Sequence, residues 1–281
     1  MKSTFESIIG LSLLFVSSWG IGEEGQTVAF FEKAGVRITK NDEGKAVKFF
    51  SRGNPPHTVE ELQKIGKLIH LEQLALNAPA AGDGDWRFLH DLKQLKQLTI
   101  WHGKAFSSLA PFCDLPIEGL TVGGCMGIRN LNQGNLQKQR DVVLTLQGLP
   151  NLRRLNLYHS PLIPDDAHLA HIAKQFPKLV DLKLDFNAPR GSETTISPDG
   201  LRSLKTLPLT DFSMENIGSF TADHMKAIAE IETLEAVLID ARRSGVDSTV
   251  IDALKSARPD LEVVVAEEGT QSPPRRSRRK N

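Results

Sequence analysis

The chain has 281 residues, of which 40% are hydrophobic and 24% are charged, and its 34 basic side chains balance its 34 acidic ones at neutral pH. These values are ordinary for a soluble globular chain, and they exclude a collagen, a largely disordered protein and a membrane protein with several spans. A chain of this length forms either two domains of usual size or one elongated domain.

The zero net charge is an average over unlike parts of the chain. The last nine residues, 273–281, contain five basic side chains and no acidic one. Without this tail and without residues 1–22, 28 basic residues stand against 33 acidic ones, so the body is mildly acidic. We therefore expect no nucleic acid as the partner of the body, whereas the basic tail can contact an anionic surface.

The N-terminal segment has the pattern of a targeting sequence. An apolar run over residues 8–16 follows the basic Lys2, and small residues stand at Ser18, Gly20 and Gly22. The run is shorter than a bilayer span, and a signal peptidase needs small side chains before its cleavage site. We therefore predict a signal peptide over 1–22 and export to the periplasm, the cell surface or the medium. An uncleaved anchor, or a buried N-terminal helix in an intracellular scaffold, is the alternative.

Residues 23–52 are predicted to form an N-terminal cap. Residues 27–34 suit a short helix, and residues 35–52 suit a hairpin whose turn is the Asn-Asp-Glu-Gly segment 41–44. Such a hairpin covers the sheet edge that the first repeat would otherwise expose.

Residues 53–267 are predicted to form an array built on the spacing L-x-x-L-x-L, in which other aliphatic residues, Phe and Met also stand at the leucine positions. Successive copies begin 22 to 35 residues apart. A weaker pair lies at each end, Val47 with Phe50 and Leu261 with Val264. The seven complete copies are Leu71/Leu74/Leu76, Leu95/Leu98/Ile100, Ile117/Leu120/Val122, Leu152/Leu155/Leu157, Leu179/Leu182/Leu184, Leu209/Phe212/Met214 and Leu234/Val237/Ile239.

This spacing predicts a short strand in each copy. The two residues of L-x-L share one face of a strand because side chains alternate, and the leucine three residues earlier turns in from the preceding loop. Each copy has an apolar edge that it cannot bury alone, so parallel stacking of the copies forms a continuous core. Helices are expected between strands, where residues typical of helix starts precede apolar residues at helical spacing. The clearest starts are Thr58, Ser197, Thr221 and Asp247.

With this repeat the chain resembles the leucine-rich-repeat proteins over residues 47–265. The resemblance implies an α/β horseshoe-shaped solenoid with a parallel concave sheet and a mostly helical convex side, and it is nearest to the longer-repeat subclass with many exported bacterial members. The family places Asn or Cys three residues after the last strand leucine, as Cys125 and Asn187 stand here. Other copies depart from this consensus, which predicts a less regular solenoid; they have Pro79, Gly103, Ser160, Ile217 and Arg242 there.

The resemblance also implies a protein or peptide partner, bound without catalysis by the concave strand face. The side chains between the leucine positions project from that face, and they change along the chain from neutral and aromatic to acidic. Large amphipathic residues are common at interface hot spots, and the acidic stretch suits a basic partner. Ordinary solvated strands carry such residues too, which is the alternative. The candidate binding residues are Trp101, Arg154, Tyr158, Asp181, Lys183, Asp185, Asp211, Glu215 and Asp240.

Two further patterns allow a small-ligand or metal site. Trp101-His102 and Tyr158-His159 fall at the same place in two copies, which indicates either a ligand site or a loop repeated by duplication. Asp165, His168 and His171 share one face of a predicted helix and could bind a metal, although the segment 164–166 is explained as a helix start.

The sequence contains no metalloprotease, paired-cysteine metal or phosphate-binding motif. We therefore predict no catalytic residue, no metal and no cofactor, with an enzyme built on a metal or histidine site as the alternative. Cys113 and Cys125 are the two cysteines, so one disulfide at most is possible. The tail over 268–281 is rich in Gly, Ser, Pro and Arg and is expected to be disordered.

Overall fold

The structure is a computed structural model that describes residues 22–52, 57–77, 84–102, 106–124, 142–159, 165–186, 196–242 and 245–267. Several sequence predictions lie outside these residues. They are the signal peptide apart from Gly22, the tail 268–281, and the consensus positions Pro79, Gly103, Cys125, Ser160 and Asn187.

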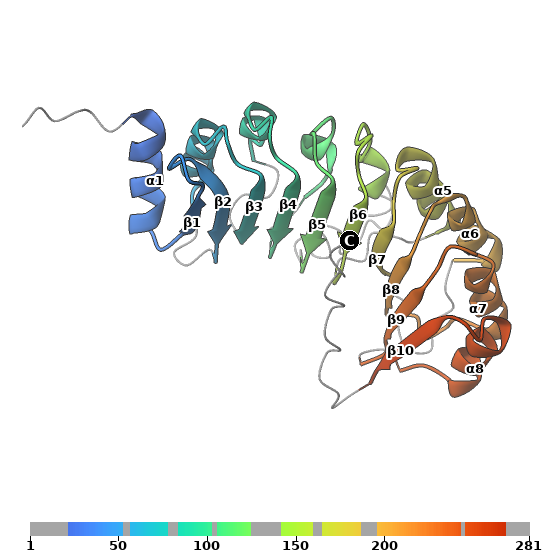
Figure 1. Ribbon diagram of the computed structural model, residues 1–281. Coiled ribbons are helices and arrows are strands. Elements are labelled where there is room, and N and C mark those ends of the chain that lie inside the picture. The colour runs from blue at the N-terminus through green and yellow to red at the C-terminus, as the bar shows by residue number, and fades with distance from the viewer. Residues whose placement is uncertain are drawn as a thin grey trace, which may run out of the picture.

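The strands of the described segments form one ten-stranded sheet in chain order, from β1 to β10. The first two strands are antiparallel, and every later pairing is parallel. Helices cover the outer side of the sheet, and the sheet lines the inner side of the curve (Figure 1). The strands are β1 Arg37–Lys40, β2 Ala46–Ser51, β3 Gln73–Asn77, β4 Gln97–Trp101, β5 Gly119–Gly123, β6 Arg154–Leu157, β7 Asp181–Asp185, β8 Asp211–Glu215, β9 Ala236–Asp240 and β10 Glu262–Ala266.

The register of the parallel strands confirms the seven complete repeats. The middle leucine position of each copy pairs with the same position of the next copy, and all seven are at most 1% exposed. Parallel stacking therefore joins the copies into one core, as the spacing predicts. The aligned residues are Leu74, Leu98, Leu120, Leu155, Leu182, Phe212 and Val237.

The two weaker flanking pairs were predicted one residue out of register. In β2, Phe49 and not Phe50 lies opposite Leu74, and Phe49 is 1% exposed. In β10, Val263 and not Val264 lies opposite Val237. Since alternate side chains of a strand point to opposite faces, this shift moves Phe50 and Val264 to the concave face.

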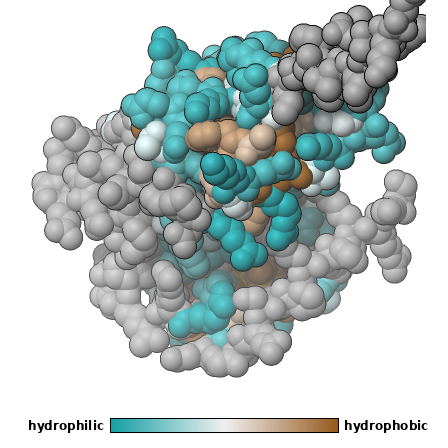
Figure 2. Space-filling view, turned by 90° about the vertical axis from the view of Figure 1, so that its left-hand side faces the viewer, coloured by the Kyte–Doolittle hydropathy of each residue, from teal (hydrophilic) through white to brown (hydrophobic). Residues whose placement is uncertain are grey.

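The N-terminal end of the array is closed by α1 (Glu23–Lys33) and the β1–β2 hairpin. Phe31 of α1 is buried, and its ring packs edge to face on Phe49 at a centroid distance of 4.9 Å. Gly44 has a φ of 77° in the hairpin turn, a conformation that favours glycine. Viewed from this end, the surface is mainly hydrophilic around a small apolar area (Figure 2).

The convex segments change in kind along the chain. Where copies begin 22 to 24 residues apart, the crossovers are 3-10 turns and one short α-helix: α2 (Val59–Gln63), η1 (Lys64–Lys67), η2 (Arg87–Asp91) and η3 (Ala110–Phe112). The last four intervals, of 25 to 30 residues, hold the helices α5 (Asp166–Gln175), α6 (Pro198–Arg202), α7 (Ala222–Ala229) and α8 (Ser248–Ala257). A short interval leaves too few residues for a full helix, so it tightens into 3-10 geometry.

The predicted helix starts are confirmed by their capping contacts. Thr58 and Glu61 form a reciprocal capping box at α2. Ser197 accepts a hydrogen bond from the Gly200 amide at α6, and Asp247 accepts one from the Thr249 amide at α8. At α7, the Thr221 amide donates to His224 Nδ1. Within the described residues, no helix is long and apolar enough to cross a membrane.

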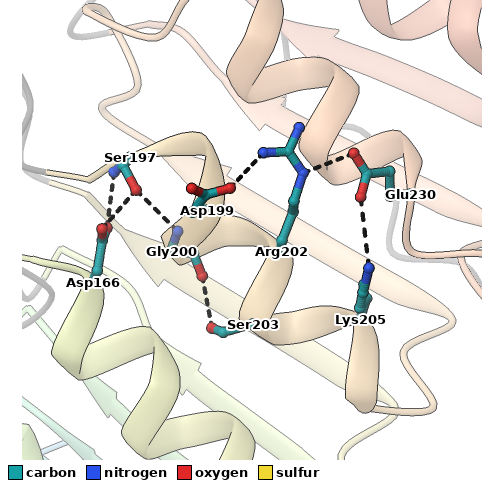
Figure 3. A network of polar contacts seen from close by, with 8 residues as sticks. All are labelled: Asp166, Ser197, Asp199, Gly200, Arg202, Ser203, Lys205 and Glu230. Carbon is teal, nitrogen blue, oxygen red and sulfur yellow. Dashed lines mark hydrogen bonds and ion pairs between the residues drawn. The ribbon is translucent and has the colours of Figure 1, made fainter.

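A polar network ties three of the convex helices together (Figure 3). The Asp166 carboxylate of α5 accepts hydrogen bonds from the Ser197 amide at 2.8 Å and from the Ser197 hydroxyl at 2.6 Å. A Cβ at Gly200 would lie 2.0 Å from Asp166 Oδ1, so the close approach of α5 and α6 requires a glycine there. Arg202 of α6 continues the network to Glu230, just after α7, at 2.8 Å.

Candidate functional site

The concave face carries the side chains that alternate with the core residues. At the carboxyl ends of the strands, one such residue from each copy lies beside the next, because the strands are parallel and in register. We call this line of residues the carboxyl-end row. From β3 to β9 it consists of Asn77, Trp101, Gly123, Tyr158, Asp185, Glu215 and Asp240.

The first part of the row is aromatic. Trp101 is partly exposed, and its ring lies 5.5 Å from that of Phe50 on β2, across the small Ala75 of β3. The Arg37 guanidinium lies 5.8 Å from the Phe50 centroid. Phe50 was predicted as a core residue, and the register of β2 places it on the concave surface instead.

Tyr158 extends the aromatic part by covering the strand beside it. A Cβ at Gly123 of β5 would lie only 2.0 Å from Tyr158 Cε1, so the ring occupies the space that any other residue at 123 would fill. On its other side, the Lys183 ammonium lies 5.2 Å from the ring centroid, within range of a cation–π contact. The glycine at 123 therefore leaves the space over β5 that the Tyr158 ring occupies.

The second part of the row holds carboxylates in adjacent strands. Asp185 lies opposite Glu215, Glu215 lies opposite Asp240, and the first two are each only 2% exposed. Like charges opposite one another destabilise a sheet, and buried charges need partners. The site must therefore contain groups that neutralise these acids.

Glu215 is bound by groups from the neighbouring strand β7 and from the turn after β6. Its Oε2 accepts a hydrogen bond from the His159 amide at 2.9 Å and lies 3.0 Å from His159 Nδ1. Its Oε1 forms an ion pair with Lys183 Nζ at 2.7 Å. Burial would raise the pKa of Glu215, but the hydrogen bonds from His159 and the charge of Lys183 outweigh burial and lower this pKa to about 2.

The backbone turns after β6 and β8 determine the direction of the contacts to Glu215 and Asp185. Asn216 follows β8 directly and His159 is the second residue after β6; their φ angles are 54° and 50°, in the left-handed region. This turn directs both the amide and the ring of His159 at Glu215. Asn216 donates from Nδ2 to Asp185 Oδ1 at 2.6 Å, which satisfies the second buried carboxylate.

Asp240, the third acid of the row, is bound by Arg242, which lies two residues further along the chain. Arg242 binds the Asp240 carboxylate through Nε at 2.9 Å and through its terminal nitrogen. The hydrogen bond from Arg242 lowers the pKa of Asp240, although burial and the charge of Glu215 oppose this effect. A pocket of about 240 Å³ opens here, lined by His159, Glu215, Asn216, Asp240 and Arg242.

Within the described residues, one group brings three possible metal ligands together. Ligand atoms of His159, Asp185 and Glu215 all lie within 4.8 Å of one another. These residue types bind divalent transition metals. The Lys183 ammonium, however, lies against Glu215 and would have to leave before a cation could bind there. The geometry is therefore that of a salt-bridged network in which Lys183 already supplies the positive charge.

The remaining predicted binding residues lie at the amino ends of the strands. Arg154, Asp181 and Asp211 are partly exposed neighbours in register on β6, β7 and β8. Opposite charges at directly paired positions stabilise a sheet, as in Arg154 and Asp181. The structure thus places all nine candidate residues on the concave face: five in the carboxyl-end row, three at the amino ends of the strands, and Lys183 midway along β7.

The repeated aromatic-histidine step, Trp101-His102 and Tyr158-His159, has a different environment in each of its two copies. His102 and His159 both adopt left-handed backbone, with φ of 53° and 50°. Only His159 contacts an acid of the row, whereas the His102 ring lies over Gly124. The repeated aromatic-histidine step is thus a shared turn conformation, and the Glu215 contact belongs to one copy.

The helix-face histidines are structural. Asp165 caps α5 by accepting from the Ala167 amide, and it binds His168 Nδ1 at 2.6 Å. His171 donates from Nε2 to the Leu146 carbonyl at 2.8 Å. The helix-start interpretation of this segment is confirmed, because each polar group has a local structural partner.

Cys113 is a free, buried thiol. It donates to the Thr145 carbonyl and accepts from the Gln147 amide, both at 3.3 Å. Burial raises the pKa of this thiol, so it is a poor nucleophile.

The repeated strand spacing, the in-register parallel sheet and the curved array with outer helices together define a solenoid with the leucine-rich-repeat fold. Solved structures similar to this chain include two bacterial proteins of that class. The leucine-rich repeat-containing protein LegL7 of Legionella pneumophila is 14% identical, and the match covers 78% of this chain and 82% of that one, with a TM-score of 0.46. A leucine-rich-repeat protein of Leptospira interrogans is 13% identical over 72% of this chain and 44% of that one, with a TM-score of 0.37. No protein-family model and no curated protein matches the sequence.

Proposed function

We propose that the protein is a non-enzymatic interaction module whose carboxyl-end row binds a segment of a partner protein. The observation that carries this proposal is the division of the row into an aromatic part, with Trp101 and Tyr158, and a carboxylate part, with Asp185, Glu215 and Asp240. A segment that fits both parts has apolar side chains at one end and basic side chains at the other. We further propose that the protein is exported, on the basis of the targeting pattern over residues 1–22.

The aromatic part supports binding because its rings are both partly exposed and held in place. Trp101 packs against Phe50, and Tyr158 lies over Gly123 beside the Lys183 ammonium. Trp and Tyr offer a large contact area, and few rotamers are lost when their rings are already fixed. Truncation of such anchors in protein interfaces commonly costs more than about 1 kcal/mol each.

The carboxylate part supports binding through its charge. Lys183 and Arg242 hold the three acids of the row in fixed positions and offset two of their three charges, so a partner meets a preorganised site with an excess of one acid. Arginine and lysine side chains bind carboxylates with charge-assisted hydrogen bonds. The aromatic part then contributes affinity, and the acidic part selects partners by charge and sets the orientation.

A displayed library of random peptides tests this proposal without a known partner. Peptides are selected on the folded wild-type protein and then measured on the Trp101→Ala/Tyr158→Ala variant. We expect selected peptides that combine apolar and basic residues, and a loss of affinity of at least tenfold in the variant. Ile69→Ala is the matched control, because Ile69 is an exposed apolar residue (51%) that lies outside the row. Peptides that bind the double variant as well as the wild type would refute the assignment of the row.

A further inference from the structure

The concave surface of the last four strands is strongly acidic. On β7 to β10, the charged side chains that face this surface comprise six acids and one lysine, Lys183, with Arg242 just beyond the end of β9. Three of the acids are at the amino-end positions, where they are partly or fully exposed to solvent. We call this surface the acidic face; its acids are Asp181, Asp185, Asp211, Glu215, Asp240 and Glu262.

The chain itself carries a segment of opposite charge within reach of this face. Residues 273–281 hold five basic side chains and no acid, and the segment is joined to β10 through Glu267. From residue 267 to residue 275 an extended chain spans up to about 26–29 Å. The distance from β10 across to β7 is three strand spacings, or about 15 Å. The basic residues can therefore reach every strand of the acidic face without disturbing the array.

We propose that residues 273–281 bind in cis to the acidic face and occupy the part of it that would receive the basic end of a partner segment. This inference rests on the proposed function, and it adds a competitor built into the same chain. Arginine guanidinium groups pair in a bidentate manner with carboxylates, and the exposed Glu262 of β10 and the partly exposed Asp211 of β8 are acids of this face at the amino ends of their strands.

The composition of the segment limits where it can bind. Residues 273–281 contain no aliphatic or aromatic side chain, so they have nothing to pack against Trp101 and Tyr158. The segment therefore competes with the basic end of a partner and leaves the aromatic part of the row open. A partner with a strong apolar anchor binds first by that anchor and then displaces the basic segment.

The covalent link to the array determines how strongly the segment lowers the affinity of a competing peptide. A short tether holds a segment at an effective concentration of about 1 mM. If the free segment binds the acidic face with a dissociation constant of about 0.1 mM, the tethered copy lowers the apparent affinity of a competing basic peptide about tenfold. The contacts are between exposed charges, so salt weakens them.

The test uses the full chain and a fluorescent synthetic peptide with the sequence of residues 273–281. The peptide is titrated in 50 mM salt against wild type and against a tail-neutral variant, in which the segment's own charges are removed. We expect about tenfold tighter binding to the tail-neutral variant, and loss of that binding in 500 mM salt. The substitutions of the tail-neutral variant are Arg275→Gln, Arg276→Gln, Arg278→Gln, Arg279→Gln and Lys280→Gln.

Two further variants locate the binding. In the tail-neutral background, Asp211→Asn with Glu262→Gln removes two acids of the face, and we expect the peptide to lose at least tenfold in affinity. The matched control is Asp42→Asn with Glu43→Gln, which removes two exposed acids from the β1–β2 turn and should leave the affinity unchanged. Equal effects of the two pairs would overturn the assignment to the acidic face.

The remaining outcomes separate this inference from the proposed function. Equal peptide affinity for wild type and for the tail-neutral variant overturns the cis contact, while the acidic face remains a site for basic peptides. Absence of binding to either protein also overturns it, and the proposed function is then judged by the peptide library and the Trp101/Tyr158 variant alone. A sedimentation assay with vesicles containing 30% phosphatidylserine tests the other outcome. If wild type sediments with the vesicles and the tail-neutral variant does not, while the two proteins bind the peptide with equal affinity, the segment binds an anionic surface and not the acidic face.

Discussion

Replacement of Glu215 by Gln tests whether the buried carboxylate stabilises the array through its charge. The pKa of Glu215 is lowered from 4.5 to about 2, where hydrogen bonds from His159 and the Lys183 ion pair outweigh the opposing effect of burial. One pKa unit corresponds to about 1.4 kcal/mol, so the ionised carboxylate contributes about 3 kcal/mol to the free energy of unfolding at pH 7. The Gln side chain has a similar size without the charge, and Glu215→Gln should remove most of this contribution.

The same shift predicts how the effect depends on pH. Because the folded pKa is below the unfolded one, the contribution is complete above about pH 5 and is lost as the pH falls toward 2. The difference in unfolding free energy between wild type and Glu215→Gln should therefore fall from about 3 kcal/mol at pH 7 to about 1 kcal/mol at pH 3.

Urea unfolding followed by circular dichroism at pH 7, 5, 4 and 3 measures this difference directly. Glu43→Gln is the control, because Glu43 is exposed in the β1–β2 turn and its substitution should change stability little at any of these pH values. A difference between wild type and Glu215→Gln that stays constant from pH 7 to pH 3, or that is below about 1 kcal/mol at pH 7, would refute the reasoning.

Three other predictions concern the core, the row and the N-terminus. Leu155→Asp should abolish the cooperative thermal melt, because Leu155 is 1% exposed between two strands and an unpaired carboxylate there costs several kcal/mol; a wild-type melting temperature would contradict the register. Gly123→Ala should displace the Tyr158 ring and lower the affinity for the library-selected peptides several-fold. Gly119→Ala, whose added Cβ meets Gln97 instead, should not lower this affinity; equal losses in the two variants would contradict a role of Tyr158 in binding. Mass spectrometry of the protein purified from its source should find a mature N-terminus near residues 21–23, and an intact Met1 would exclude cleavage of the segment 1–22.

The repeat and its core were predictable because alternation along a strand leaves a direct trace in the sequence. The errors occurred where alternation fails. Phe49 and Phe50 are adjacent aromatics, and Val263, Val264 and Val265 are three identical residues, so either register buries an apolar side chain. The choice between registers is made by pairing with the neighbouring strand, which local spacing does not record.

The contacts of the site were less accessible to prediction than its location. The concave residues followed from the alternation, but His159 and Glu215 are 56 residues apart, and their contact depends on a left-handed turn at His159. One signal was present. Neighbouring copies place Asp185, Glu215 and Asp240 at equivalent positions, and three adjacent carboxylates require cations close by. Lys183, two residues before Asp185 on the same strand face, is the nearest candidate on those grounds.

The change from 3-10 crossovers to α-helices along the chain also determines the shape of the surface that a partner meets. Strands lie about 4.8 Å apart, whereas packed helices need about 8–10 Å, so a copy with an outer helix is wedge-shaped and a copy with a thin crossover is nearly parallel-sided. The sheet accordingly runs almost straight through β2 to β5 and bends through β7 to β10 (Figure 1). Trp101 of the aromatic part thus lies on the straighter stretch of the sheet, and the acidic part lies on the bend. A partner segment that spans both parts of the row therefore has to follow a change of curvature between Trp101 and Asp240.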